Sequence, residues 1–149
     1  MADISFYHLQ NQSLEDSLPK LAERIVSMNA KAVIKVNDKT TAKLLDKALW
    51  TYSPESFLPH SVEGTKYPKD QILYITTKDD NPAEATMALM VNGAMIDDIE
   101  QYERVLYMFE SKQDEVISQA RNDYKQFKNA GHTVTYWQQK DQGGWEKKS

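Results

Sequence analysis

Apolar residues recur along the chain in two kinds of pattern. Short blocks rich in β-branched and aromatic residues, continuous or alternating with polar ones, predict strands. These blocks lie at residues 4–9, 32–36, 71–77, 86–93, 104–110 and 132–137. Longer stretches in which apolar residues recur every three or four positions predict helices instead. These stretches cover residues 18–29, 39–50 and 112–130.

The order of these elements predicts the fold class. The first four alternate strand, helix, strand, helix, which implies parallel strands joined by right-handed crossovers. We therefore expect a single α/β domain with a mainly parallel central sheet flanked by helices, Rossmann-like but without a nucleotide-binding loop. Ser17 and Asp38 are the predicted N-caps of the first two helices, and Gly131 is predicted to end the last helix.

Composition adds the expectation of one domain in the cytoplasm. The 149 residues suffice for a single core, and 40% hydrophobic with 27% charged residues is ordinary for a globular protein. No apolar run is long enough to span a membrane, the first residues lack the features of a signal peptide, and cysteine is absent. We expect a cytoplasmic protein, monomeric on its own, with its domain at residues 1–138 and a flexible tail at residues 139–149.

The charge argues against a protein that coats nucleic acid. The formal net charge is −4 at pH 7, whereas phosphate-binding domains carry basic surfaces. This average conceals an asymmetry, because residues 111–149 hold seven Lys/Arg against five Asp/Glu, a local charge of +2. Direct binding to DNA is therefore not expected, and basic character is concentrated late in the chain.

The sequence contains no catalytic constellation. The five glycines form neither a dinucleotide-binding nor a P-loop pattern, and there is no nucleophile elbow. The three histidines are widely separated, and the acidic pairs at 79–80 and 97–98 suit caps and solvated turns better than metal ligation. We expect no catalytic residue, no metal site and no cofactor. The alternative is a nucleotide-dependent or nuclease-like enzyme on the same scaffold, since fold does not fix function.

The helix predicted at residues 112–130 combines apolar and basic residues along one edge. Arg121, Lys125 and Lys128 form a stripe beside its apolar arc, and Tyr124 lies near the seam between them. An aromatic wall beside cationic groups suits an acidic peptide that ends in a hydrophobic residue. The same stripe also fits the solvated flank of a core helix, and periodicity alone leaves both interpretations open.

A second aromatic segment, ALWTYSPESFLPH at residues 48–60, follows the helix predicted at residues 39–50. Trp50, Tyr52 and Phe57 cannot all share the inward face that Leu45 and Leu49 already occupy, so part of this aromatic surface is expected to meet another chain. The alternative is a lid that folds back on the sheet. Trp145 is expected to be an incidental residue of the tail.

Three stretches together resemble the chi subunit family of bacterial DNA polymerase III. They are Phe6-Tyr7 in the first strand, the frame LDKALWTYSPESFLPH, and ARNDYKQFKNAG followed by a strand that ends in Trp137. The resemblance implies a single non-catalytic α/β domain. Members link the clamp loader, through the psi subunit, to the acidic C-terminal tail of the single-stranded DNA-binding protein.

The resemblance also implies roles for five residues. Arg121, Tyr124 and Lys125 would form the pocket for that tail, with the two cations pairing with carboxylates and Tyr124 walling the terminal aromatic residue. Trp50 and Phe57 would belong to the surface that meets psi or, in some relatives, an iron–sulfur helicase. The sequence therefore predicts a replication adaptor with two protein partners.

Overall fold

The computed structural model describes most of the chain. It describes residues 3–148 except 11, 29, 52–59, 63–72, 79–80, 82–83 and 142–143, and for residues 50, 51 and 60–62 it describes the backbone alone. Within the described part, no helix is both long and apolar enough to cross a membrane.

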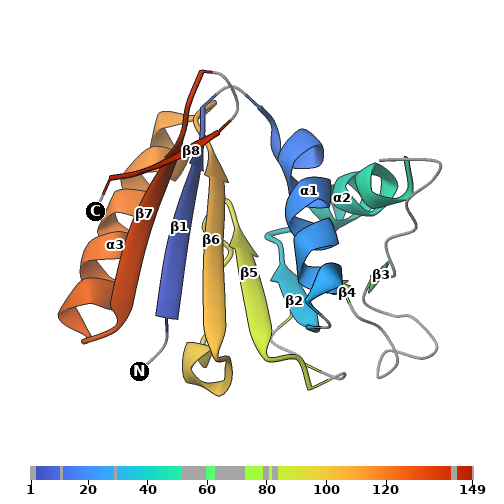
Figure 1. Cartoon of the computed structure of the whole chain (residues 1–149), viewed down its shortest axis with the longest axis horizontal. Helices are drawn as coiled ribbons and strands as arrows, with labels where there is room; N and C mark the ends of the chain where they lie inside the picture. Colours follow the sequence, from blue (N-terminus) through green and yellow to red (C-terminus); the bar gives the residue numbers. More distant parts are fainter. Residues whose placement is uncertain are drawn as a thin grey trace.

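The described strands form one eight-stranded sheet in the order β3-β4-β2-β5-β6-β1-β7-β8 (Figure 1). Their bounds are β1 Asp3–Leu9, β2 Ala32–Lys35, β3 His60–Val62, β4 Leu73–Thr76, β5 Met87–Val91, β6 Arg104–Glu110, β7 Thr133–Gln139 and β8 Trp145–Lys147. Every neighbouring pair is parallel except β7 and β8, which are antiparallel. The predicted single α/β domain with a mainly parallel, Rossmann-like sheet is confirmed.

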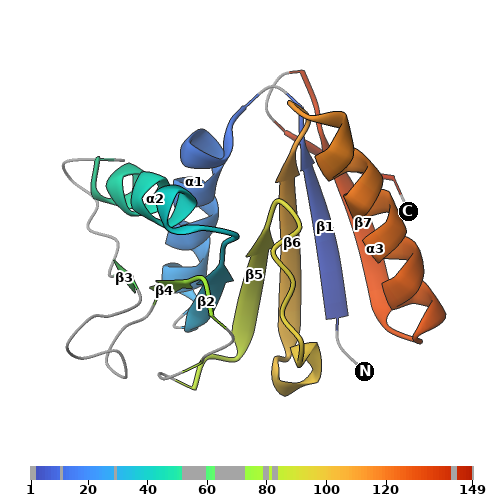
Figure 2. The same cartoon turned by 180° about the vertical axis from the view of Figure 1, so that it is seen from behind.

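Helices cover both faces of this sheet. The bounds are α1 Leu14–Ser27, α2 Lys39–Thr51 and α3 Asp114–Asn129, with a short 3-10 turn, η2, at Ile99–Gln101. Figures 1 and 2 show α1 and α2 beside one half of the sheet and α3 beside the other. α1 and α2 pack in one hydrophobic core and α3 in a second core on the opposite face.

Side-chain alternation along the strands divides the two cores. In β1, Phe6 and His8 face α3, whereas Tyr7 packs against the core beneath α1. In β2, Val33 belongs to the α3-side core and Ile34 to the α1-side core. Because central parallel strands are buried on both faces, their sequences are nearly continuous apolar runs.

Two of the three predicted helix-terminal residues, Asp38 and Gly131, are confirmed. Asp38 Oδ1 accepts a hydrogen bond from the Thr41 backbone N–H at 2.7 Å, which confirms this cap and lowers the pKa of Asp38. Gly131 has a φ of +93°. Its N–H donates to the Lys128 carbonyl, and the N–H of His132 donates to the Phe127 carbonyl. This arrangement is a Schellman motif, so the predicted end of the last helix is also confirmed.

The predicted cap at Ser17 is wrong. α1 begins at Leu14, a full turn earlier, and Ser13 occupies the N-cap position. Ser17 is buried inside the helix, and its N–H makes the first helical bond, to the Ser13 carbonyl at 3.1 Å. Two acidic residues of the first turn, Glu15 and Asp16, lie where the helix dipole favours negative charge.

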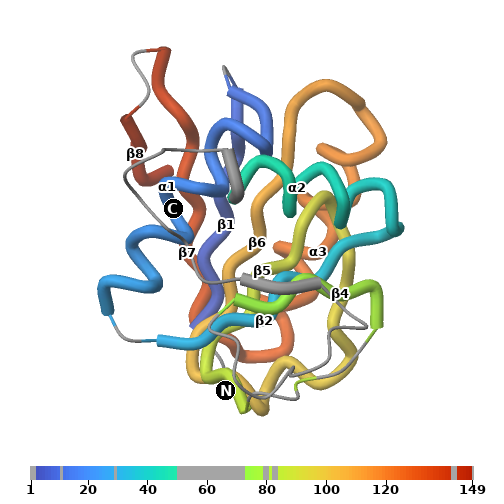
Figure 3. Tube along the Cα trace, turned by 90° about the vertical axis from the view of Figure 1, so that its right-hand side faces the viewer, coloured from blue at the N-terminus to red at the C-terminus, as the bar shows by residue number. Residues whose placement is uncertain are grey.

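The C-terminal end contains a strand within the segment expected to be a tail. Trp145–Lys147 form β8 and pair with Trp137–Gln139 at the outer edge of the sheet, where Figure 3 shows β8 beside β7. The Trp145 ring meets the Tyr7 ring edge to face, with the centroids 5.2 Å apart. The domain boundary at residue 138 stays a prediction.

Candidate functional site

α3 is held over the sheet by a buried polar contact. The Tyr107 hydroxyl donates a hydrogen bond to Asp123 Oδ2 at 2.7 Å, and burial raises the pKa of both groups. Ala120 and Phe127 bury the same face of the helix. These contacts point Asp123 toward β6. The adjacent flank of α3, which carries Arg121, Tyr124 and Lys125, lies toward β7.

Tyr124 lies on that flank, above a row of aromatic rings. Phe6 stacks on Tyr107 at 4.4 Å and lies parallel to Tyr136 at 6.2 Å, because the three occupy paired positions on β6, β1 and β7. Tyr124 meets Phe6 and Tyr136 edge to face, at 5.5 and 5.8 Å between centroids. The half-buried Tyr124 ring is therefore fixed in place by its neighbours.

The predicted cations Arg121 and Lys125 are exposed on α3 beside Tyr124. Neither forms an ion pair with a carboxylate of the described residues. The Arg121 charge acts on Tyr136 and His8 beneath it. Burial raises the pKa of Tyr136, and the Arg121 charge opposes this shift. The structure thus brings Arg121, Tyr124 and Lys125 together on one surface, while their role in peptide binding stays a prediction.

A chain of hydrogen bonds beneath Arg121 determines which nitrogen of the neutral His8 ring carries the proton. Ser111 Oγ donates to the Leu9 carbonyl at 2.7 Å, so it must accept from His8 Nε2 at 2.6 Å. His8 Nδ1 is then the acceptor for the Tyr136 hydroxyl at 2.8 Å. The ring is neutral at pH 7, because burial, and secondarily the Arg121 charge, lowers the pKa of His8 below its ordinary value of 6.5.

Two further residues of this surface were not assigned to the pocket from the sequence. Lys128 Nζ lies 3.4 Å from the Tyr124 hydroxyl and 5.4 Å from the ring centroid, a cation–π contact. Its spacing of four residues from Tyr124 already placed it in the basic stripe. Tyr136 forms a second aromatic wall of this surface beside Tyr124. The sequence indicates this only through alternation, because Val134 and Tyr136 are two positions apart in β7 and therefore face the same core.

The second predicted surface can be placed only in part. The backbone of Trp50 lies in the last turn of α2, but its side chain is outside the description. Phe57 lies outside the described residues altogether. The assignment of Trp50 and Phe57 to a partner surface therefore stays a prediction.

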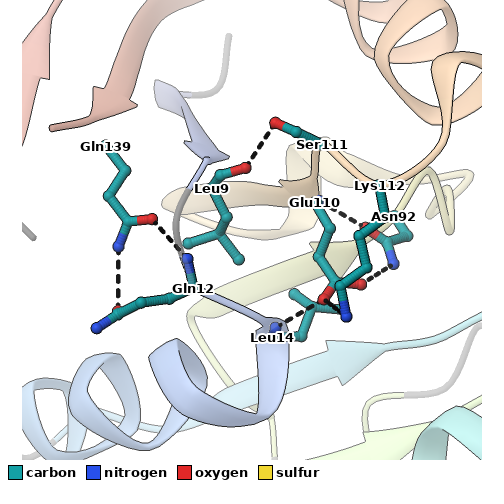
Figure 4. A network of polar contacts seen from close by, with 8 residues as sticks. All are labelled: Leu9, Gln12, Leu14, Asn92, Glu110, Ser111, Lys112 and Gln139. Atoms are coloured by element: carbon teal, nitrogen blue, oxygen red, sulfur yellow. Dashed lines mark hydrogen bonds and ion pairs between the residues drawn. The ribbon is translucent and has the colours of Figure 1, made fainter. Parts of the chain in front are cut away.

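The carboxyl ends of β1 and β6 form the switch point where bound nucleotides lie in many α/β proteins. At this position Glu110 Oε2 accepts the N–H of Leu14, the first residue of α1, at 3.1 Å (Figure 4). Glu110 also accepts from Asn92 Nδ2 at 3.3 Å and lies 3.5 Å from Lys112 Nζ. A protein carboxylate thus occupies the helix terminus that a phosphate would use.

Metal-binding chemistry is not apparent in the described part of the chain. No group of three or more His, Asp or Glu side chains there is arranged to hold an ion. Both ring nitrogens of His8 are hydrogen-bonded, one to Ser111 and the other to Tyr136. The His132 ring packs against the Phe127 ring, with the centroids 6.0 Å apart. The side chain of His60 is not described.

Comparison with known proteins places the chain in a family. The family model described as DNA polymerase III chi subunit, HolC, matches residues 1–135. A protein named probable DNA polymerase III subunit chi, from Rickettsia prowazekii (strain Madrid E), is 31% identical over 109 residues. This match covers 73% of the chain and 66% of the relative, slightly less than two thirds of its length.

A solved structure shares the fold. The C-terminal domain of S. cerevisiae Dbp5, in a complex with Gle1 and IP6, superimposes with a TM-score of 0.60. The match covers 91% of this chain and 90% of that chain, at 14% sequence identity. At this identity the likeness concerns the fold alone.

Proposed function

The chain belongs to the DNA polymerase III chi subunit family, which supports a role as a replication subunit, and from this premise we propose a non-catalytic adaptor. One arm binds the acidic C-terminal tail of the single-stranded DNA-binding protein. The other arm binds psi, and through psi the clamp loader. The proposal places this work in the cytoplasm and gives the protein no reaction of its own.

The observation that carries the first arm is the pairing of two exposed cations with a fixed aromatic ring. Arg121 and Lys125 have no carboxylate partner among the described residues. The carboxylates of an acidic peptide supply the negative charges that pair with these two cations. Tyr124 is held by Phe6 and Tyr136 before any peptide arrives, which reduces the entropy lost on binding. A terminal aromatic residue has a wall to pack against.

Lys128 strengthens this assignment. Its ammonium group lies over the Tyr124 ring and near the Tyr124 hydroxyl, at the end of the same flank. Three cations therefore border one aromatic surface, while the protein as a whole carries a net charge of −4. This local positive potential favours a short acidic segment and steers its approach.

The first arm is tested by fluorescence anisotropy. A labelled peptide copying the C-terminus of the same organism's single-stranded DNA-binding protein is titrated with this protein, beside a peptide that lacks the terminal residue. Saturable binding is expected for the full peptide and strong loss for the shortened one. Arg121→Ala, Tyr124→Ala and Lys125→Ala are each expected to weaken binding by about tenfold, the usual cost of a charge-assisted bond or an anchoring ring.

The control variant is Lys43→Ala, which removes an exposed cation from α2 instead. Its affinity for the peptide should equal that of the unchanged protein. Unfolding midpoints measured alongside distinguish lost binding from lost structure. Equal affinities for Arg121→Ala, Lys125→Ala and Lys43→Ala would show that the peptide does not use this flank.

The second arm rests on family membership and on the segment around Trp50 and Phe57. Co-elution of this protein with purified psi in size-exclusion chromatography is expected, and Trp50→Ala with Phe57→Ala should abolish it. An iron–sulfur helicase is the other partner to be assayed with the same double variant. Retention of both complexes by the double variant would exclude this segment as the interface.

A further inference from the structure

A separate cavity lies on the other face of the sheet, between α1 and β8. Its volume is about 170 Å³, and its floor is formed by Tyr7 and Met108. α1 contributes Lys20 and Arg24 to its wall, and β8 contributes Trp145. None of these residues belongs to the α3 flank, so this cavity is distinct from the surface described above.

The aromatic side of the cavity is a corner made by two rings. Tyr7 and Trp145 are nearly perpendicular, at 80°, with their centroids 5.2 Å apart. Both rings, with Leu21, pack against the core beneath α1 and remain partly exposed. Such a corner offers one ring face and one ring edge to an aromatic guest, which is the geometry that aromatic pairs prefer.

The polar side of the cavity is built from two amides whose orientation the hydrogen bonds determine. Gln139, which is 2% exposed, accepts the backbone N–H groups of Gln10 and Gln12 through Oε1, at 3.2 Å each. Figure 4 shows the bond from Gln12. Its Nε2 must then donate to Gln12 Oε1, at 3.0 Å. Ser17 Oγ donates to the same Gln12 oxygen at 3.0 Å.

This arrangement leaves a donor at the cavity. Because Gln12 Oε1 receives both bonds, Gln12 Nε2 points away from Gln139 and donates to no described residue (Figure 4). Lys20 and Arg24 are exposed at the same cavity and form no ion pair with a described carboxylate. The residues that line the cavity in the described part of the chain include no Asp or Glu. Cationic and neutral donors therefore converge here, and no described carboxylate accepts from them.

We propose that the cavity between α1 and β8 binds an organic anion in which a carboxylate lies close to a single aromatic ring. The Arg24 guanidinium, the Lys20 ammonium and the Gln12 amide bind the carboxylate, and the ring enters the corner between Tyr7 and Trp145. A volume of about 170 Å³ suits one ring with its carboxylate. It is below the roughly 300 Å³ at which drug-sized ligand sites begin, so a nucleotide does not fit.

The test uses two probes that differ in charge alone. N-acetyl-phenylalanine carries the carboxylate, and N-acetyl-phenylalaninamide replaces it with a neutral amide. Each is titrated into the isotopically labelled full chain and followed by proton–nitrogen correlation spectra. The acid is expected to shift the Trp145 indole and Gln12 side-chain signals in a saturable manner, and the neutral amide is expected to shift them little. Trp145→Phe, which keeps an aromatic ring, assigns the indole signal.

Variants then separate this site from the α3 flank. Arg24→Ala is expected to weaken binding of the acid by about tenfold, since a bidentate charge-assisted contact is lost, whereas Lys43→Ala should not change it. Arg121→Ala should also leave it unchanged. Equal shifts with the neutral amide, unchanged affinity in Arg24→Ala, or saturable shifts confined to the Tyr124 region would each overturn the proposal. The result at this cavity does not depend on whether the acidic tail binds at Arg121, so the two proposals can fail separately.

Discussion

The two faces of the sheet each place an arginine beside an aromatic ring, but they support the ring differently. On the α3 face, Tyr124 stands on a row of stacked rings, and the polar groups below it, His8, Ser111 and Tyr136, bond to one another. On the α1 face, Tyr7 and Trp145 form an open corner at the edge of the sheet. The α3 face therefore presents a well-packed surface, whereas the α1 face presents a cavity lined by hydrogen-bond donors that have no described acceptor.

The strand β1 contributes an aromatic residue to each of these two faces. Phe6 and Tyr7 are adjacent in β1, and alternation turns the first toward α3 and the second toward α1. Phe6 is fully buried and Tyr7 only partly so. Neighbouring aromatic residues in a central parallel strand can thus support two different surfaces of the protein.

The largest expected effect comes from truncating these two neighbours. Phe6→Ala should lower the free energy of unfolding by about 3–5 kcal/mol, because it leaves a cavity in the row of rings. Tyr7→Ala should cost less, since its ring is already partly in water. Urea denaturation of both variants measures the difference. Equal losses would mean that the two rings support the fold equally and that the comparison fails.

The next effect isolates the contact that orients α3. Tyr107→Phe removes the hydroxyl that donates to Asp123 at 2.7 Å and leaves a buried carboxyl without this partner. A loss of about 1–3 kcal/mol in unfolding free energy is expected from stranding such a group. The paired variant Tyr107→Phe with Asp123→Leu should recover part of the loss. No recovery in urea denaturation would place the cost in packing rather than in the hydrogen bond.

Much of this arrangement was predictable from local pattern. The strand and helix periods gave the α/β class, and the arc of α3 placed Tyr124 beside Arg121 and Lys125. The start of α1 was not predictable in this way. Pro19 suggests a helix beginning just before it, yet the buried Leu14 and its bond to Glu110 extend the helix by one turn.

The remaining features depend on register between distant strands. The rings of Phe6 and Tyr136 contact each other because the register of β1 and β7 pairs these two residues, which are 130 positions apart in the sequence. Ser111 meets His8 in the same way, beyond the end of β6. The position of Trp145 likewise follows from the pairing of β8 with β7. No local period encodes these contacts, so the cavity beside Trp145 could not be inferred from the sequence.

A pH titration sharpens the contrast, because His8 lies on the α3 face alone. Burial lowers its pKa below the ordinary 6.5, so its contribution to stability is fully present above pH 6.5 and is lost as the pH falls through the folded value. The unfolding free energy should therefore fall as the pH drops below 6.5, the ordinary pKa of histidine. His8→Phe should reduce this slope. An unchanged slope in the variant would assign the acid sensitivity to other groups.

The smallest expected effect is a difference in salt dependence between the two faces. The cations of the α3 flank are exposed, so salt should screen their attraction for the acidic peptide over a distance of about 10 Å near 0.1 M. At the cavity, a ring contact and the neutral Gln12 donor share the binding with Lys20 and Arg24. Raising NaCl from about 0.05 M to about 0.5 M should therefore weaken the tail peptide more than N-acetyl-phenylalanine. Parallel titrations measure both ratios. Equal ratios would mean that charged contacts contribute the same share of the affinity on both faces, and the contrast between the two faces would be wrong.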